Sequence, residues 1–176
     1  MDNLSYPVGK FVWPKDVTDD DRHRWIREIA QLPADVRAAV GGLSDAQLDT
    51  PYRPGGWSVR QVVHHLADSH MQAVVRLRLA LTEDAPTIRP YDQDGWADLS
   101  DSKSGPVEPS LQLLDGLHER WAALAGSLPP EAFGRVFFHP ELDKDVSVDS
   151  LLAMYAWHGH HHAAHITGLR EREGWT

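Results

Sequence analysis

The sequence contains no cysteine among its 176 residues. Disulfide-stapled folds and thiolate metal sites are therefore excluded, and any metal site must use nitrogen and oxygen ligands. No apolar run approaches the roughly 18 residues that a membrane-spanning helix needs. The first residues lack the basic and apolar segments of a secretory signal. These absences make a cytoplasmic protein with no membrane partner the expectation.

Positive charge is also scarce, because 17 lysines and arginines stand against 26 aspartates and glutamates. The formal net charge of −9 disfavours nucleic acids and anionic membrane surfaces as partners. What the chain does hold is typical of a globular protein, with 41% hydrophobic and 24% charged residues. We expect a single domain over residues 1–176.

Four long segments have the hydrophobic spacing of helices. They cover approximately residues 19–40, 58–82 and 111–128, and a last segment that begins at Ser147 or Asp149 and ends before Gly174. The expected fold is all-α: a four-helix bundle with a long loop between helices 2 and 3 and a small hairpin before the last helix. A loop of that length inside a compact domain is often functional. Pro33 is expected to kink or divide the first helix, and residues 1–17 to form an extended arm that packs its aromatic rings on the body.

The most unusual stretch lies in the last helix, where residues 155–165 hold five of the 11 histidines. At about 100° per residue, His158, His162 and His165 fall in the middle of the apolar stripe, where leucine would be expected. His161 lies on the edge of that stripe. The competing interpretation is a set of core histidines with separate hydrogen-bond partners. A shared cation would satisfy several inward imidazoles with fewer partners.

Two histidines four residues apart on a helix can reach one metal ion. The pair His158 and His162 brackets the centre of the stripe, whereas the pair His161 and His165 is tilted to one side. We therefore prefer the first pair as ligands.

The second helix offers two histidines as further candidates. His70 falls within its apolar face, and periodicity alone favours it over His65, which lies on a polar side. That polar side is either exposed to solvent or the lining of an internal cavity, and periodicity leaves both open. It also carries Gln61, Asp68, Ser69, Gln72 and Arg76.

Two motifs resemble those of a known family. Residues 57–68 read WSVRQVVHHLAD and residues 155–162 read YAWHGHHH, similar to the second-helix and last-helix motifs of the DinB/YfiT-like metalloenzyme superfamily. The loop RPGGW at residues 53–57, PYD at 90–92 and GW at 174–175 bring the chain close to the YfiT branch. The resemblance covers nearly the whole chain.

The resemblance implies a bacterial four-helix bundle with a three-histidine metal site and a homodimeric assembly. Carried over by motif, the ligands are His65, His158 and His162, with one divalent metal per chain, Zn²⁺ ahead of Ni²⁺. His65 rests on the resemblance, whereas the other two also follow from spacing. His165 departs from the pattern as an extra inward histidine, either a partner of a ligand or a competitor for the metal. Seven tryptophans and the aromatic arm also favour the homodimer.

YfiT-like proteins resemble bacillithiol transferases, so the resemblance implies a transferase that joins a low-molecular-weight thiol, bacillithiol-like, to electrophilic small molecules. The alternative is a metal-dependent hydrolase that uses a zinc-bound water, and a further alternative is a non-catalytic metal-binding protein. We expect the transferase ahead of the hydrolase. Three neutral histidines leave a tetrahedral zinc one open position, which takes water or a thiolate equally well. The ligands therefore do not separate the two reactions.

Further roles fall to residues near the expected ligands. Three side chains that share the side of His65 are candidates to orient ligands or substrate, or else form a solvated face: Asp68, Ser69 and Gln72. Arg76 is a candidate partner for a substrate carboxylate, and His64 and His161 are candidate bases. A wide cleft with cationic groups would favour an anionic thiol, and a closed site with a fourth protein ligand would favour a structural metal.

Overall fold

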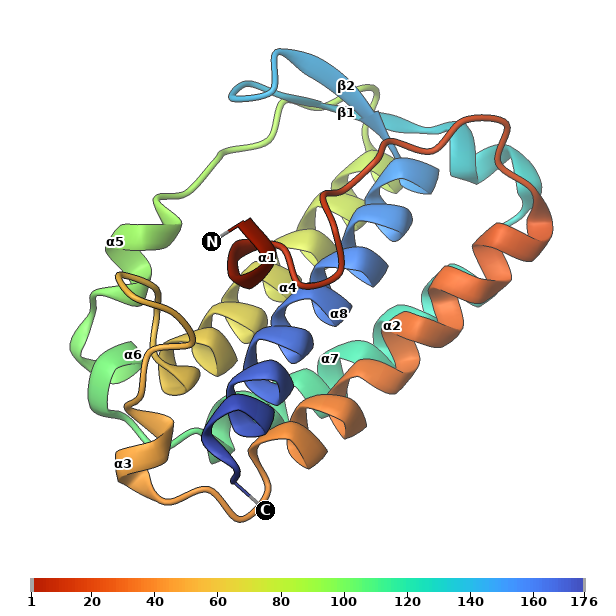
Figure 1. Ribbon diagram of the computed structural model, residues 1–176. Helices are drawn as coiled ribbons and strands as arrows, with labels where there is room; N and C mark the ends of the chain where they lie inside the picture. The colour runs from red at the N-terminus through yellow and green to blue at the C-terminus, as the bar shows by residue number, and fades with distance from the viewer. Residues whose placement is uncertain (1, 176) are drawn as a thin grey trace.

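Four long helices form the body of the molecule in the computed structural model, which describes residues 2–175 (Figure 1). They are α2 Asp19–Val40, α4 Val59–Thr82, α7 Glu108–Gly126 and α8 Val148–Glu173. The all-α four-helix bundle expected from the sequence is confirmed. Within residues 2–175, no helix combines the length and the apolar character needed to cross a membrane.

The long helices pack as a ring in which α2 and α4 each contact both α7 and α8. Consecutive helices α2 and α4 are therefore diagonal to each other, unlike the neighbours of a simple up-and-down bundle. Figure 1 shows α2 and α8 running in one direction and α4 and α7 in the other. Because α4 and α7 are parallel, the chain between them must return along the length of the bundle, which explains the long loop.

Local sequence signals set the ends of these helices. The side chains of Thr18, Ser58 and Ser147 cap the first turns of α2, α4 and α8 by accepting a hydrogen bond from a backbone N–H three residues on. Gly174 ends α8 with a φ of 66°, a left-handed conformation that favours glycine. Pro33 does not divide α2, which continues through it.

The expected hairpin consists of β1 Val136–His139 and β2 Lys144–Ser147, paired antiparallel. Its outer edge fixes the start of the long loop, because Phe138 N donates to Pro86 O at 2.9 Å and Ile88 N donates to Phe138 O at 3.1 Å. The remaining short elements are α1 Asp2–Ser5, α3 Asp45–Leu48, α5 Gln93–Ala97, α6 Ser100–Ser104 and the 3-10 helix η1 Pro130–Gly134.

The N-terminal arm crosses α8 (Figure 1). It begins with α1 and is extended only after that helix. Trp157 Nε1 donates to Gly9 O at 3.1 Å, and the Phe11 ring lies 5.8 Å from the Trp157 ring between centroids. The arm therefore packs aromatic side chains on the body, as the sequence indicates.

Buried apolar residues form two clusters, one toward the hairpin and one toward α3. A polar layer separates them, to which each long helix contributes one group. These groups are the Ile29 carbonyl of α2, His70 of α4, His118 of α7 and His158 of α8. The bundle thus places buried imidazoles at mid-height, between its two apolar clusters.

Candidate metal centre

Three imidazoles from two helices meet beside this polar layer. Nitrogen atoms of His65 on α4 and of His158 and His162 on α8 all lie within 4.8 Å of one another. His65 Nε2 and His158 Nε2 are 3.2 Å apart. Two nitrogens bound to one tetrahedral zinc at about 2.0–2.1 Å lie about 3.3 Å apart, so this spacing fits a shared cation.

Hydrogen bonds behind His158 determine which of its nitrogens is free. The Ile29 carbonyl can only accept, so the 2.6 Å contact from His118 Nδ1 places the proton of His118 on that nitrogen. His118 Nε2 then accepts from His70 Nδ1 at 3.0 Å, and His70 Nε2 accepts from His158 Nδ1 at 3.1 Å. The series ends with a lone pair on His158 Nε2, the atom that faces His65. A fixed tautomer of this kind is what a metal-binding histidine requires.

His162 is held by a shorter series of the same kind. His165 Nε2 lies 3.4 Å from the Ser5 carbonyl oxygen, and His165 Nδ1 lies 3.4 Å from His162 Nδ1. Since the carbonyl accepts, His165 carries its proton on Nε2 and accepts from His162 at Nδ1. The lone pair of His162 is then on Nε2. The extra histidine of the sequence therefore lies behind an expected ligand, stacked on Tyr52 at 3.9 Å between ring centroids.

A second trio shares one member with the first. Nitrogens of His161, His162 and His165 also lie within 4.8 Å of one another. His161 Nδ1 is buried and has no hydrogen-bond partner within residues 2–175. The second trio is therefore a competing set of ligands, and a variant that loses a member of one set alone, such as His65 or His161, separates the two sets.

Burial keeps these imidazoles neutral. It lowers the pKa of His65 to about 4, with a smaller contribution from His161. Burial is also the main reason that the pKa values of His158 and His162 lie well below the usual range, and neighbouring imidazoles add to it. At neutral pH the ligands therefore present lone pairs without first losing a proton, which favours cation binding.

The three imidazoles line a cavity of about 580 Å³. Trp57 and Tyr52 form one wall, and the Trp57 ring lies 4.6 Å from the His65 ring between centroids. Tyr6 and Trp157 lie on the arm side of the same cavity. Among the described residues, neither histidine trio includes an aspartate or glutamate. Three imidazoles at an accessible cavity leave room for a water or a substrate at the metal, as in catalytic zinc sites.

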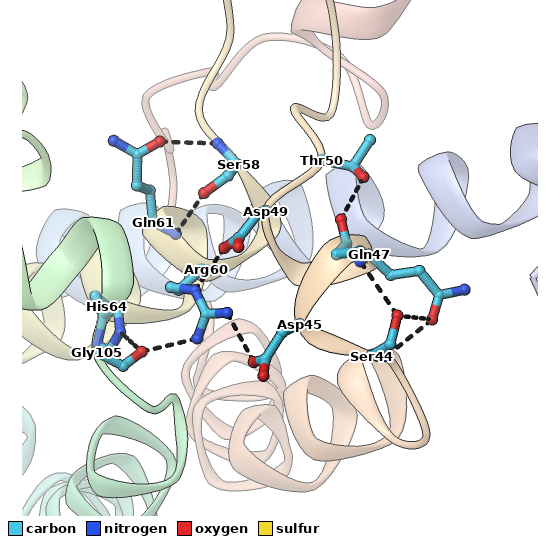
Figure 2. Close-up of polar contacts among 11 residues, drawn as sticks. Ser44, Asp45, Gln47, Asp49, Thr50, Ser58, Arg60, Gln61, His64 and Gly105 are labelled. Carbon is cyan, nitrogen blue, oxygen red and sulfur yellow. Dashed lines mark hydrogen bonds and ion pairs between the residues drawn. The ribbon is translucent and has the colours of Figure 1, made fainter.

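Arg60, a buried side chain on the first turn of α4, holds the chain at Asp49, just before the wall formed by residues 50–57. Figure 2 shows this arginine between α3 and the segment after α6. Its Nε donates to Asp49 at 2.7 Å, one terminal nitrogen donates to Asp45 at 2.9 Å and the other donates to Gly105 O at 2.8 Å. The network ties three segments together at the end of the metal cavity.

Other residues singled out in the sequence have different surroundings. His64 is turned away from the centre, with Nδ1 2.7 Å from Ser110 Oγ and Nε2 3.4 Å from Gly105 O. Burial and the nearby Asp101 raise the pKa of Asp68. Gln72 is half-buried. Arg76 and Ser69 line a separate cavity of about 330 Å³ that also touches His158.

His70, which periodicity favours as a ligand, lies behind His158 rather than beside His65. In the sequence, His118 is only one residue of the third helical segment, and nothing beside it marks it as functional. The useful signal was an inward histidine on each of three helices. A buried imidazole needs a hydrogen-bond partner, and imidazoles on neighbouring helices can pair with one another.

Known proteins resemble the chain over nearly its full length. A sequence model of the DinB superfamily matches residues 19–166. YfiT of Bacillus subtilis, provisionally named a metal-dependent hydrolase, is 48% identical over 174 residues, covering 99% of this chain and 98% of the relative. A Bacillus mycoides protein with the same provisional assignment is 49% identical over 175 residues, or 99% of this chain and 100% of the relative.

The solved structure of Bacillus subtilis YfiT superposes with a TM-score of 0.97 at 48% identity, covering 99% of both chains, and is described as an unusual four-helix bundle. That description agrees with the diagonal placement of consecutive helices found here. The chain therefore belongs to the DinB superfamily, as a close relative of YfiT.

Proposed function

We propose that the protein is a metal-dependent hydrolase of small molecules, with one divalent cation held by His65, His158 and His162. The observation that carries this proposal is the convergence of three neutral imidazoles at the wall of an accessible cavity. The provisional names of relatives about half identical to the chain support the hydrolase assignment. Zn²⁺ is the preferred cation and Ni²⁺ the second, because imidazole nitrogen suits both.

The residues of the chain prepare the centre for this reaction. A cation held by the three imidazoles would supply Lewis acidity and would lower the pKa of a bound water or thiol. His70 and His118 hold His158 in the tautomer that binds, and His165 does the same for His162. Trp57 and Tyr52 shield the imidazoles from bulk water on one side.

His161 lines the same cavity and was a candidate base. Burial lowers its pKa to about 4. A group with that pKa accepts protons poorly at neutral pH, since an efficient general base has a pKa near the working pH. We therefore assign His161 a hydrogen-bonding role toward substrate rather than proton abstraction.

A thiol S-transferase is the second candidate function. The chain has no cysteine, so a nucleophilic sulfur would have to arrive with a substrate such as a bacillithiol-like thiol. The buried Arg76 in the neighbouring cavity would suit an anionic thiol. The same three ligands serve both reactions.

The test compares metal-loaded protein, metal-free protein and the His158→Ala variant. Each is given a panel of esters and amides, and separately a model electrophile with bacillithiol, with cysteine or with no thiol. We expect metal-dependent ester or amide cleavage that His158→Ala abolishes. The matched control is His160→Ala, because His160 is an exposed histidine of the same helix.

Metal-dependent conjugation of bacillithiol without hydrolysis would replace the hydrolase by the transferase. A tightly bound metal with neither activity would support a metal-binding protein without catalysis.

The homodimer stays a prediction. A groove of about 900 Å³ along α2 and α8, lined by Trp25, Trp157 and Trp175 among others, supports it. Light scattering at micromolar concentration should give twice the chain mass, and a monomer mass at every concentration would contradict it.

A further inference from the structure

A second cavity lies on the hairpin side of His158. Its volume is about 330 Å³, and it shares His158 and Gln93 with the metal cavity. Residues from α4, the long loop, β1 and α8 surround it. Those that matter for its chemistry are Ser69, Arg76, Tyr91, His139, Tyr155 and His158. A molecule in this cavity would reach the imidazole of an expected metal ligand.

Three polar atoms at this cavity are buried and have no hydrogen-bond partner within residues 2–175. They are Arg76 Nε, Tyr91 Oη and His139 Nδ1. Such atoms are rare in folded proteins, and three around one cavity indicate a missing acceptor. The part of the chain that the structure describes holds six such atoms, so half of them line this one cavity.

Of these three residues, Arg76 has the strongest need for a partner, because its side chain carries a positive charge. Only 9% of the residue is exposed, and no carboxylate in residues 2–175 lies within ion-pair distance of it. A mostly buried guanidinium without an anion is unfavourable, because the charge has lost much of its water without gaining a partner. An anion in the cavity would supply the partner that this charge lacks.

The side chains of Tyr91 and His139 can each donate a hydrogen bond. Burial raises the pKa of Tyr91 to about 12, so its hydroxyl keeps its proton at neutral pH. Burial, together with the charge of Arg76, lowers the pKa of His139, which is therefore neutral and can carry its proton on Nδ1. The neighbouring Ser69 hydroxyl and, to a smaller extent, the charge of Arg76 lower the pKa of Tyr91, although less than burial raises it. The charge of Arg76 is thus felt at both of the other donors.

Two carboxylates also line the cavity but do not neutralise Arg76. Glu141 is exposed. Asp92 is engaged in capping α5, where its Oδ1 accepts from Gly95 N at 2.9 Å. Both lie on the loop and hairpin rather than on α4, so the cavity combines a cationic interior with acidic residues from its outer segments.

We infer that Arg76, Tyr91 and His139 form a binding site for a carboxylate group of the substrate, next to the metal centre. The planar fork of arginine matches the two oxygens of a carboxylate, and the tyrosine and histidine donate one hydrogen bond each. The hydroxyls of Ser69 and Tyr155, 3.5 Å apart, lie in the same cavity beside His158. A substrate anchored here extends past His158 toward the metal.

Carboxylate binding at this site does not require the hydrolase reaction. Only the turnover that follows binding rests on the proposed function. Its test therefore begins with metal-free protein, in which a carboxylate cannot bind a cation. Calorimetric titration compares succinate with succinamide, which has a similar shape and no charge. We expect succinate to bind and succinamide to bind at least about tenfold more weakly, as charge-assisted hydrogen bonds are lost.

Two variants locate the binding. Arg76→Gln should weaken succinate binding about tenfold or more, and Tyr91→Phe should weaken it by a smaller factor. Arg78→Gln is the matched control, because Arg78 lies on the same helix and is exposed, and it should bind as the unmodified protein does. Equal binding of succinate and succinamide, or full binding by Arg76→Gln, would overturn the assignment.

A second arm separates this inference from the proposed reaction. Metal-loaded protein is given an ester that carries a free carboxylate and the corresponding amide-capped ester. Faster turnover of the charged ester that is lost in the Arg76→Gln variant would support both the carboxylate site and the hydrolase. Retained succinate binding without any turnover would leave the carboxylate site standing and contradict the hydrolase.

Discussion

Two buried arginines on α4 have nearly the same exposure, 4% for Arg60 and 9% for Arg76, and opposite surroundings. Arg60 bonds to two carboxylates and a backbone carbonyl (Figure 2). Arg76 has a buried Nε with no partner in residues 2–175. Two arginines that are buried to a similar extent on one helix therefore differ in whether groups of the protein pair with them. The expected ligand His65 lies on the same helix between these two arginines.

Acid should have the largest effect on stability, because it turns neutral buried histidines into buried cations like Arg76. Burial lowers the pKa of His65, His161 and His165 to about 4, against about 6.5 in the unfolded chain. The unfolded state therefore binds protons first as the pH falls, and stability present above pH 6.5 is lost toward pH 4. We expect the metal-free protein to lose about 3 kcal/mol or more of its free energy of unfolding between pH 7 and pH 5.

Urea unfolding at each pH measures this loss. The variant His160→Ala, at an exposed histidine, should follow the same curve. An unfolding free energy that is constant from pH 7 to pH 5 would mean that the buried imidazoles take up protons with the same pKa as in the unfolded chain.

Replacing Arg60 and replacing Arg76 should change the free energy of unfolding differently. Arg60→Ala removes three hydrogen bonds, two of them to carboxylates, and should lower the free energy of unfolding by about 2–3 kcal/mol. Arg76→Gln removes an unpaired buried charge and should leave the stability unchanged or raise it slightly. Urea unfolding of both variants at pH 7 is the measurement. Equal destabilisation by the two changes would show that Arg76 has a structural partner after all.

The histidines behind the ligands should have a smaller effect. His70→Leu removes the acceptor for His158 Nδ1. Zinc affinity should fall about 10–100-fold, the usual result of losing an outer partner of a ligand. A competition titration with a fluorescent chelator measures it, and the control is His64→Leu, because His64 is a buried histidine of the same helix that contacts Ser110 instead. Unchanged affinity in His70→Leu would show that the hydrogen-bond series does not prepare the metal site.

The sequence predicted the α8 part of the centre better than the α4 part, for a physical reason. His158 and His162 interrupt an apolar stripe, so the helical period alone places them inside. His65 shares a side of α4 with Ser69 and Arg76, and a polar side is as compatible with solvent as with a cavity. The structure buries all three residues. Only the resemblance to a known family pointed to His65.

The helix ends were also predictable, because the caps at Thr18, Ser58 and Ser147 depend on neighbouring residues alone. The order of the helices around the bundle was not predictable, since a pattern of apolar faces does not say which helices are diagonal to each other. The polar layer was not predictable either, because the hydrogen bond between His70 and His118 joins residues 48 positions apart in the chain.

We expect one metal ion to bind to His65, His158 and His162. Zinc competition titrations of His65→Ala and His161→Ala test it most directly, because the two possible trios share His162 and each variant disables only one. We predict that His65→Ala loses more than about 100-fold in affinity, beyond the effect of losing an outer partner, while His161→Ala still binds one zinc per chain with little change. Full zinc binding by His65→Ala together with its loss in His161→Ala would contradict the account and place the metal at His161, His162 and His165.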